Sequence, residues 1–352
     1  MRDIWYLVLP LIISALITPV VKQIGYRLDA FAQMNERTVH HGKIVRIGGV
    51  AIYLAFIITM ALYVKTDMAM NGILIGSTIM FIGGLVDDLV NLKPLYKFSF
   101  QVVAAIVLIA SGVPLDVIRL PLGITINMGV VSFIVTFFWI TGITNAVNLI
   151  DGLDGLCGGI SVIILTVIAM LAVIEGRGDV EMIALILVGA TLGFLIYNAH
   201  PASIFMGDCG ALFLGFIISA ISLLGFKSST IMTLALPLLL LALPIIDTLS
   251  AILRRTLKGH KFSEADKSHI HHLLMNKFGH KNTVIIMCIV TALFGLTAYV
   301  YMINKGIGLI SLFVIMLAVD LFIEGSGMIS DKYHPILSVS RRIIRRLTRK
   351  RP

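Results

Sequence analysis

The chain has 352 residues, of which 58% are hydrophobic and 13% are charged, about half the charge content of soluble domains. With a mean hydropathy of +0.99, this composition excludes a soluble enzyme, a disordered chain and a nucleic-acid-binding domain, although the net charge is +9. The apolar runs are also too long for the ~10-residue alternating strands of an outer-membrane barrel. The sequence therefore predicts an all-α polytopic integral membrane protein.

Eleven apolar runs, bounded by charged residues, glycine or proline, approach the ~20 residues with which a helix crosses a bilayer. Four prolines fall inside these runs. Helix bundles tolerate them, because neighbouring helices satisfy the carbonyls that proline leaves without a hydrogen bond. The region 113–127 alternates apolar and turn residues, which predicts a small hairpin. The eleven expected spans are 4–21, 47–64, 71–86, 98–112, 128–146, 156–174, 182–199, 209–226, 229–252, 283–303 and 306–323.

The basic residues predict the orientation of these spans. Of the 28 lysines and arginines, 22 fall in one alternating set of connecting segments. Because cytoplasmic loops are enriched in Lys and Arg, we expect this set to be cytoplasmic, with the N-terminus outside and the C-terminus inside. Residues 1–325 would form a single transmembrane domain and 326–352 a basic tail. The expected cytoplasmic loops are 22–46, 87–97, 147–155, 200–208 and 253–282.

The tail carries seven basic residues between Ser340 and Pro352, interleaved with Ile343, Ile344 and Leu347. This pattern is typical of a basic amphipathic segment on the anionic lipid of the inner leaflet. The net positive charge therefore has a membrane explanation, and we expect no nucleic-acid partner.

Acidic side chains collect at the cytoplasmic ends of the expected spans. Such residues are costly at membrane depth and indicate function by default. A single aspartate at a helix end is commonly a cap, but six at one face favour a shared site. They are Asp87 and Asp88 in GGLVDDLVNL, Asp151 and Asp154 in NAVNLIDGLDGL, Asp208 in MGDCG, and Asp247 in LPIIDTL.

Converging carboxylates repel one another unless cations are present, and Mg²⁺ is a natural partner because it binds a few carboxylates together with substrate phosphates. Asp151 and Asp154, three residues apart, would share one face of a helical turn. Basic side chains for phosphate lie nearby, at Lys43, Arg46 and Lys97, with histidines in DKSHIHHLL. Together these residues suggest phosphoryl transfer between a soluble nucleotide and a membrane lipid.

Several of these residues have a structural alternative. Asn148 could cap or bridge helices, Phe205 could pack in the core or stack on a nucleobase, and His200 could only orient its loop. A cation-coupled transporter also uses intramembrane carboxylates. It would be expected to place them near the midplane of repeated halves, whereas here they lie at one face and no repeat is evident.

The motifs resemble those of the polyprenyl-phosphate N-acetylhexosamine-1-phosphate transferase family. The resemblance rests on GGLVDDLVNLKPLYK, ITNAVNLIDGLDGL, YNAHPASIFMGDCGALFLGF, LPIIDT and DKSHIHHLL, in this order over nearly the whole chain. It is greatest for the bacterial undecaprenyl-phosphate N-acetylglucosamine-1-phosphate transferases, which start teichoic acid, common-antigen and O-antigen synthesis. Two departures are Val45, where many members have proline, and Ile270, which interrupts the three adjacent histidines of the phospho-N-acetylmuramoyl-pentapeptide transferases.

This resemblance implies a phosphoglycosyl transferase of the bacterial cytoplasmic membrane, with the active site on the cytoplasmic face. UDP-GlcNAc and undecaprenyl phosphate would give undecaprenyl-diphospho-GlcNAc and UMP, with Mg²⁺ or Mn²⁺ as cofactor. The phospho-N-acetylmuramoyl-pentapeptide transferase activity is the alternative within the family. Related enzymes are often dimers, so a homodimer is also implied.

The resemblance also assigns roles by matched position. Asp87 or Asp88 would activate the lipid phosphate, either for direct attack or through a covalent intermediate, and His271 and His272 match the cytoplasmic histidine motif. Asp208 matches the metal ligand, with Asn148 against the metal and pyrophosphate. The residues matched to nucleoside or phosphate binding are Asp151, Gly152, Leu153, Asp154, Phe205 and Lys97. Further candidates for substrate binding, chosen because they are basic or acidic, are Lys43, Asp247 and His269.

Overall fold

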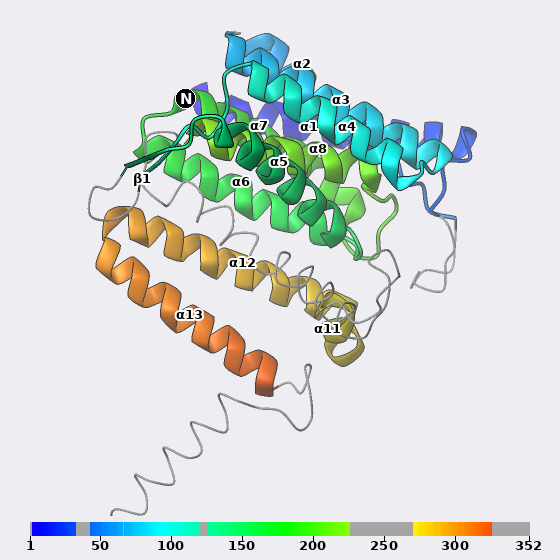
Figure 1. Ribbon diagram of the computed structural model, residues 1–352. Coiled ribbons are helices and arrows are strands. Elements are labelled where there is room, and N and C mark those ends of the chain that lie inside the picture. The colour runs from blue at the N-terminus through cyan, green and yellow to red at the C-terminus, as the bar shows by residue number, and fades with distance from the viewer. Residues whose placement is uncertain (1, 33–42, 66, 120–124, 226–269, 326–352) are drawn as a thin grey trace, which may run out of the picture.

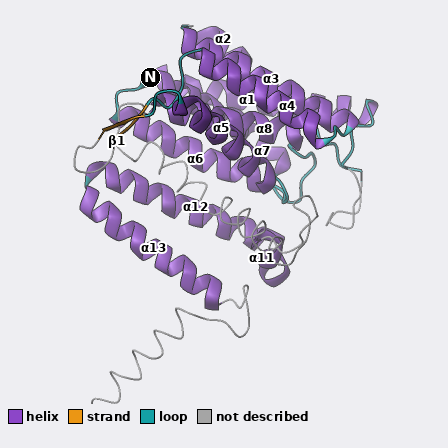
Figure 2. Ribbon diagram, viewed as in Figure 1, coloured by secondary structure: helices purple, strands orange, loops and turns teal. Residues whose placement is uncertain are grey.

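The computed structural model describes residues 2–32, 43–65, 67–119, 125–225 and 270–325, and these form a helical bundle with one short hairpin (Figures 1 and 2). The helices in the first half are α1 (Arg2–Arg27), α2 (Gly49–Tyr63), α3 (Met68–Val90), α4 (Pro94–Ala110) and α5 (Val131–Ile150). Those that follow are α6 (Leu156–Ile174), α7 (Gly178–Asn198), α8 (Gly207–Gly225), α11 (Ile270–Phe278), α12 (His280–Ile303) and α13 (Lys305–Gly325).

Seven of the described helices are long and apolar enough to cross a membrane, and α2, α4 and part of α13 are shorter apolar helices. The chain is therefore a multi-pass membrane protein. Ten of the eleven expected spans coincide with a described helix, while the span 229–252 lies outside the described residues. The largest difference in a boundary is at the end of α1, which continues to Arg27 rather than ending at residue 21. Helix α4 begins at Pro94 rather than at residue 98, because proline is well suited to the first position of a helix.

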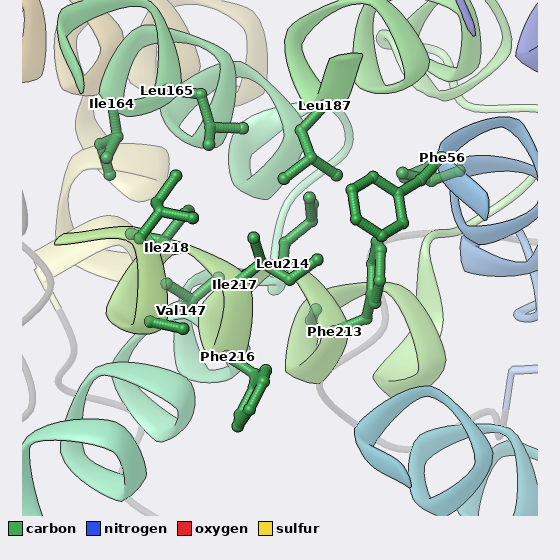
Figure 3. Close-up of a cluster of buried hydrophobic side chains, with 14 of the residues drawn as sticks. Phe56, Val147, Ile164, Leu165, Leu187, Phe213, Leu214, Phe216, Ile217 and Ile218 are labelled. Carbon is green, nitrogen blue, oxygen red and sulfur yellow. The ribbon is translucent and has the colours of Figure 1, made fainter. Parts of the chain in front are cut away.

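Helix α8 forms the centre of the bundle. In its apolar window 89% of residues are buried, against 22% for α1, so α8 is surrounded by protein and α1 presents much of its surface to the bilayer. Figure 3 shows the α8 side chains Phe213, Leu214 and Ile217 among side chains from α2, α6 and α7. The helix that carries Asp208 at its N-terminus is thus held rigidly from several sides.

The other helices are arranged around α8. Helices α3 and α5 pack directly against it, α4 lies outside α3, and α1 packs along α7. Helix α12 packs against α6, and α13 lies beside α12 at the margin of the molecule (Figure 1). This order brings the C-terminal ends of α3 and α5 to the N-terminal end of α8.

The hairpin predicted for 113–127 is confirmed. Strands β1 (Val117–Arg119) and β2 (Thr125–Asn127) pair in antiparallel register, with Val117 opposite Asn127. The preceding segment is fixed to α5, since the Leu115 amide donates to Thr136 Oγ1 over 2.8 Å. The hairpin joins α4 to α5 and lies at the opposite end of these helices from the aspartates.

Glycines let the start of α2 and helix α3 approach the start of α8 closely. A Cβ at Gly84 would lie 2.5 Å from the carbonyl oxygen of Asp208, and one at Gly49 would collide with the backbone of Gly210. Only glycine permits these backbone contacts. The glycines therefore let the start of α8, which carries Asp208, pack directly against α3, in addition to the contacts between charged side chains.

Gly207 is the tightest of these positions, and its replacement gives a stability prediction. Its φ is +71°, and a Cβ there would meet the Arg46 carbonyl and lie 2.6 Å from Asp88 Oδ2. We expect Gly207→Ala to destabilise the protein by at least ~2 kcal/mol, because strain from the positive φ adds to overpacking. Thermal unfolding in detergent measures this loss of stability. Gly176→Ala is the matched control, since Gly176 has a φ of +68° and no neighbour within 4 Å. Equal losses in the two variants would contradict the close-contact explanation.

Candidate functional site

Three aspartates form a carboxylate cluster where α3 ends and α8 begins. Carboxylate oxygens of Asp87, Asp88 and Asp208 lie within 4.8 Å of one another and could together hold a metal ion. Asp87 and Asp88 are almost fully buried, at 4% and 3% exposure. Unpaired charges at such depth are very costly, so the cations and donors around each carboxylate define its role.

Asp88 is bound on both oxygens by groups that position α8. Its Oδ1 accepts from Arg46 Nε over 2.9 Å and from the Asp208 amide over 3.0 Å. Its Oδ2 accepts from the Cys209 amide over 2.9 Å. The Asp88 carboxylate therefore caps the start of α8, where free amides favour an anion, and ties that start to the segment before α2.

Arg46 lies in that segment, outside the helices, and is 18% exposed at its side chain. Burial alone would lower the pKa of Arg46, but the carboxylates of Asp88, Asp208 and Asp87 outweigh it and raise that pKa. Its guanidinium is therefore a permanent positive charge at the cluster, as is usual for arginine. Arg46 had been expected only as one of several phosphate partners, and the structure shows that it is already bound to Asp88.

Asp87 has a different environment. Its Oδ1 accepts from the Leu92 amide over 2.9 Å, and its Oδ2 lies 2.8 Å from Lys97 Nζ. Lys97 also contacts Asp208 Oδ2, while Asn148 Nδ2 donates to Asp208 Oδ1 over 3.1 Å. The Lys97 ammonium thus lies between two carboxylates and is 28% exposed. The structure brings together Asp87, Asp88, Lys97, Asn148 and Asp208, all of them expected from the sequence.

A pair of amides lies one helical turn further into the bundle. Gln101 Nε2 donates to Asn145 Oδ1 over 3.0 Å, and Asn145 Nδ2 donates to Gln101 Oε1 over 2.9 Å. Gln101 follows Lys97 by one turn of α4, and Asn145 precedes Asn148 by about one turn of α5. This reciprocal amide pair therefore links the two helices that supply the partners of Asp208.

Residues 151–155 form a turn between α5 and α6 rather than a helical turn, so the expectation that Asp151 and Asp154 share a helix face is wrong. Gly155 reverses the chain with a φ of +74°, and its amide donates to Asn198 Oδ1 over 3.1 Å. Gly152 is exposed and Leu153 is buried. The glycines of this motif thus form a tight turn at the end of α5.

The carboxylate cluster affects the pKa of Asp151. Burial, followed by the negative charges of Asp208 and Asp88, raises the pKa of Asp151 to about 8. A carboxyl group with this pKa is largely protonated at neutral pH unless a cation is added nearby. The excess of negative charge around Asp151 is thus consistent with a site that receives a cation.

Asp154 belongs to a separate cluster with two histidines. Its Oδ2 accepts from the Ala202 amide over 3.1 Å and lies 2.9 Å from His200 Nδ1. His280 Nε2 lies 3.9 Å from the same oxygen. His200 therefore contacts a residue of another segment and does not only orient its own loop. His280 was not singled out in the sequence, because it lies far along the chain at the start of α12.

Phe205 lies in an extended segment that pairs with the residues before α2. Its amide donates to the Val45 carbonyl over 2.8 Å, and its carbonyl accepts from the Gly48 amide over 2.9 Å. Val45 is fully buried, so this segment is well packed with valine in place of the family's proline. The Phe205 side chain is half-buried beside the start of α8, which is compatible with either role expected for it.

The remaining candidates belong to other parts of the chain or lie outside the described residues. Lys43 is exposed, and its ammonium lies 5.3 Å from the centre of the Phe31 ring. His271 and His272 belong to helix α11. Asp247 and His269 lie outside the described residues.

The donors around Asp208 fit a hard divalent ion. They are the carboxylate oxygens of Asp87, Asp88 and Asp208, with an ammonium between two of them, and Mg²⁺ and Mn²⁺ prefer oxygen ligands of this kind. The fold and this cluster together define a class of protein: a polytopic membrane protein with a cation- and phosphate-compatible site at the ends of its helices.

Comparison with known proteins identifies the family. The family model described as glycosyl transferase family 4 matches residues 70–226. A probable undecaprenyl-phosphate N-acetylglucosaminyl 1-phosphate transferase of Bacillus subtilis is 37% identical over 96% of both chains. A decaprenyl-phosphate N-acetylglucosaminephosphotransferase of Mycobacterium tuberculosis is 32% identical over 79% of this chain and 76% of its own. The chain belongs to glycosyl transferase family 4.

The phospho-N-acetylmuramoyl-pentapeptide transferases are less similar over a shorter region. The protein of that name from Streptococcus uberis is 30% identical over 64% of this chain and 74% of its own. The greater coverage by the N-acetylglucosaminyl 1-phosphate transferases agrees with the branch to which the motifs are most similar.

Proposed function

We propose that the protein transfers N-acetylglucosamine 1-phosphate from UDP-GlcNAc to undecaprenyl phosphate, giving undecaprenyl-diphospho-GlcNAc and UMP. The observation that carries this proposal is the carboxylate cluster of Asp87, Asp88 and Asp208, bridged by Lys97 at the ends of α3, α4 and α8. Its position at helix ends suits a reaction between a membrane lipid and a soluble nucleotide. The extended similarity to the Bacillus transferase supports the same substrates.

The chemistry follows from the partners of each carboxylate. Asp87 takes any proton from the lipid phosphate, because its Oδ2 accepts from no backbone amide of the described residues and lies beside the partly exposed Lys97, with Arg46 further away at 3.7 Å. The lipid oxygen forms a bond to the sugar-linked phosphorus as the bond from that phosphorus to the UMP oxygen breaks. Lys97 and Arg46 offset negative charge, and the closely held α8 keeps the reacting groups aligned.

We further propose Mg²⁺ or Mn²⁺ as the cofactor, which Asp208 would hold together with Asn148, whose amide would turn from the orientation in which its Nδ2 donates to Asp208 to present its oxygen. When bound, this ion would neutralise charge on the phosphoryl oxygens. Lys97 already occupies a cationic position between Asp87 and Asp208, so the cluster tolerates positive charge there. Asp151, Gly152, Leu153, Asp154 and Phe205 line the neighbouring turn and segment as the nucleoside side of the site.

The location of the site is part of the proposal. The 22 basic residues in one set of segments support eleven spans, an external N-terminus and a cytoplasmic site in one transmembrane catalytic domain, residues 1–325. Single cysteines can be placed at Lys93 and Lys305 in a cysteine-free background. An impermeant maleimide should label only Lys305→Cys in intact cells.

Light scattering in detergent tests the homodimer.

A direct assay tests the reaction. Purified protein is incubated with UDP-[¹⁴C]GlcNAc, undecaprenyl phosphate and Mg²⁺, and both labelled lipid and UMP are measured. Formation of the two products in equal amounts is expected, and chelation of Mg²⁺ should stop it. Absence of both products would refute the proposal. Transfer from UDP-N-acetylmuramoyl-pentapeptide in place of UDP-GlcNAc would replace it with the alternative activity.

The amide pair gives a prediction about positioning. We expect Gln101→Leu to lower kcat about tenfold, because α4 and α5 lose a link in the membrane worth ~0.6–1.7 kcal/mol and Lys97 and Asn148 lose their alignment. Asn145→Leu should act similarly, and the double variant should be no worse than either single variant. Steady-state kinetics at several Mg²⁺ concentrations measure the effect.

Exchange of the two amides is the control for the amide pair. The double variant Gln101→Asn with Asn145→Gln keeps both hydrogen-bonding groups and should recover much of kcat. Additive losses in the leucine variants, or no recovery in the exchanged pair, would show that these residues act separately.

A further inference from the structure

A second group of metal-ligating side chains lies outside the carboxylate cluster. It consists of Asp154 from the turn between α5 and α6, His200 from the segment between α7 and α8, and His280, the first residue of α12. One ligand atom from each residue lies within 4.8 Å of the others. We propose that these three side chains, hereafter the histidine cluster, bind a divalent transition-metal ion at a site distinct from the carboxylate cluster, with Asp154 lying between this ion and the nucleoside side of the proposed active site.

The donor set selects the class of metal. Two imidazoles and one carboxylate suit Zn²⁺, Co²⁺, Fe²⁺ or Ni²⁺, whereas all-oxygen sites suit Mg²⁺. The carboxylate cluster offers no imidazole, and the histidine cluster offers only one carboxylate. The protein thus has two groups of ligands with different metal preferences, so one metal can be used to probe each.

The separations are compatible with shared coordination. Asp154 Oδ2 lies 2.9 Å from His200 Nδ1 and 3.9 Å from His280 Nε2. Ligands ~2.0–2.2 Å from a common metal ion are separated by about 3–4 Å. The two imidazole rings are stacked, with centroids 4.2 Å apart and planes at 21°. Binding of one ion therefore requires the two rings to tilt apart, so that a nitrogen of each points to the ion beside Asp154.

The surroundings provide the orientation and access that a metal site needs. The Asp154 carboxyl is 2% exposed, and its direction is fixed by the Ala202 amide, as outer hydrogen bonds commonly fix metal ligands. The His280 side chain is 8% exposed. The His200 side chain is 37% exposed, which gives an ion a route from solvent.

Charge also favours a metal over a purely ionic cluster. A protonated His200 would pair with Asp154, but a second imidazolium 4.2 Å away would repel the first. A divalent ion binds both imidazoles in their neutral form and supplies the positive charge that the buried carboxylate requires. Since the three ligands come from separate segments, the ion would cross-link α12 to the turn before α6 and to the segment before α8.

Cobalt binding tests this proposal independently of the transferase reaction. The purified full chain, with any tag removed, is stripped of metal and titrated with Co²⁺ while visible absorption is recorded. We expect ligand-field bands that His200→Gln and His280→Gln abolish and Zn²⁺ displaces. His280→Cys should retain a site and add a thiolate-to-cobalt band in the near ultraviolet, which shows that the altered chain still folds.

Asp208→Asn is the control, since it alters the carboxylate cluster and leaves the histidine cluster intact. We expect this variant to keep the cobalt bands. The proposal is overturned if wild-type protein gives no bands, if Asp208→Asn removes them, or if His271→Gln or His272→Gln removes them while His200→Gln does not. Zn²⁺ should also raise the unfolding temperature of the wild type and of Asp208→Asn, but not of His280→Gln.

Discussion

Asp208→Asn is expected to lower the rate of UMP release by at least ~10³-fold. Asp208 is the point at which Lys97 and Asn148 meet. The substitution removes one negative charge and one metal ligand, and leaves the amide that donates to Asp88 in place. We therefore expect a folded protein in which chemistry fails, with a loss in kcat that saturating UDP-GlcNAc does not restore.

Manganese binding separates this explanation from a general loss of structure. Electron paramagnetic resonance of Mn²⁺ should show a high-affinity ion in the wild type and none in Asp208→Asn. Asp116→Asn is the matched control, because Asp116 accepts from Ser132 Oγ beside the hairpin, at the other end of α5. Retention of Mn²⁺ affinity by Asp208→Asn would contradict the assignment of Asp208 as a metal ligand.

The helices were largely predictable from the sequence because a bilayer imposes one simple requirement, a run of apolar residues long enough to cross it. The ends of the helices show the limit of that argument. Helix α4 begins at Pro94 and includes Lys97, which was expected in a loop, whereas Gln101 fell inside the expected span 98–112. A hydropathy pattern detects the apolar part alone, so the first turn, which supplies Lys97 to the site, was missed as helix.

The composition of the carboxylate cluster was also predictable, because the aspartates lie in motifs at the ends of expected spans. Lys97 and Asn148 were expected beside them, but other partners were not. Arg46, before α2, binds Asp88 at the end of α3, and His280 approaches Asp154 from more than a hundred residues away. The expected shared face of Asp151 and Asp154 failed because Gly155 turns the chain there. Contacts made by tertiary packing leave no periodic signal in one sequence.

The different roles of Asp87 and Asp88 are a further case. Adjacent residues on a helix point about 100° apart, so the pair faces two environments. Asp88 faces the start of α8 and Arg46, whereas Asp87 faces Lys97. The sequence DD carries no indication of which residue anchors the helix and which one is available for proton transfer.

Two asparagine substitutions separate these roles. We expect Asp88→Asn to destabilise the protein by about 3 kcal/mol, because it removes the carboxylate that binds Arg46 most closely and turns an amide donor toward a backbone amide. Asp87→Asn keeps an acceptor for the Leu92 amide, and the two cations beside it, Lys97 and Arg46, keep their contacts with Asp208 and Asp88. Its stability should change by less than ~1 kcal/mol, while kcat falls ~10²- to 10⁴-fold.

Thermal unfolding and turnover, measured on the same preparations, decide the matter. A lower unfolding temperature in Asp88→Asn, with a near-normal one in inactive Asp87→Asn, supports one anchoring and one reacting carboxylate. Asp88→Glu sharpens the test, since it keeps the charge but moves it away from the Cys209 amide, and should be intermediate in stability. If Asp88→Asn unfolds as the wild type does and Asp87→Asn does not, the two assignments must be exchanged.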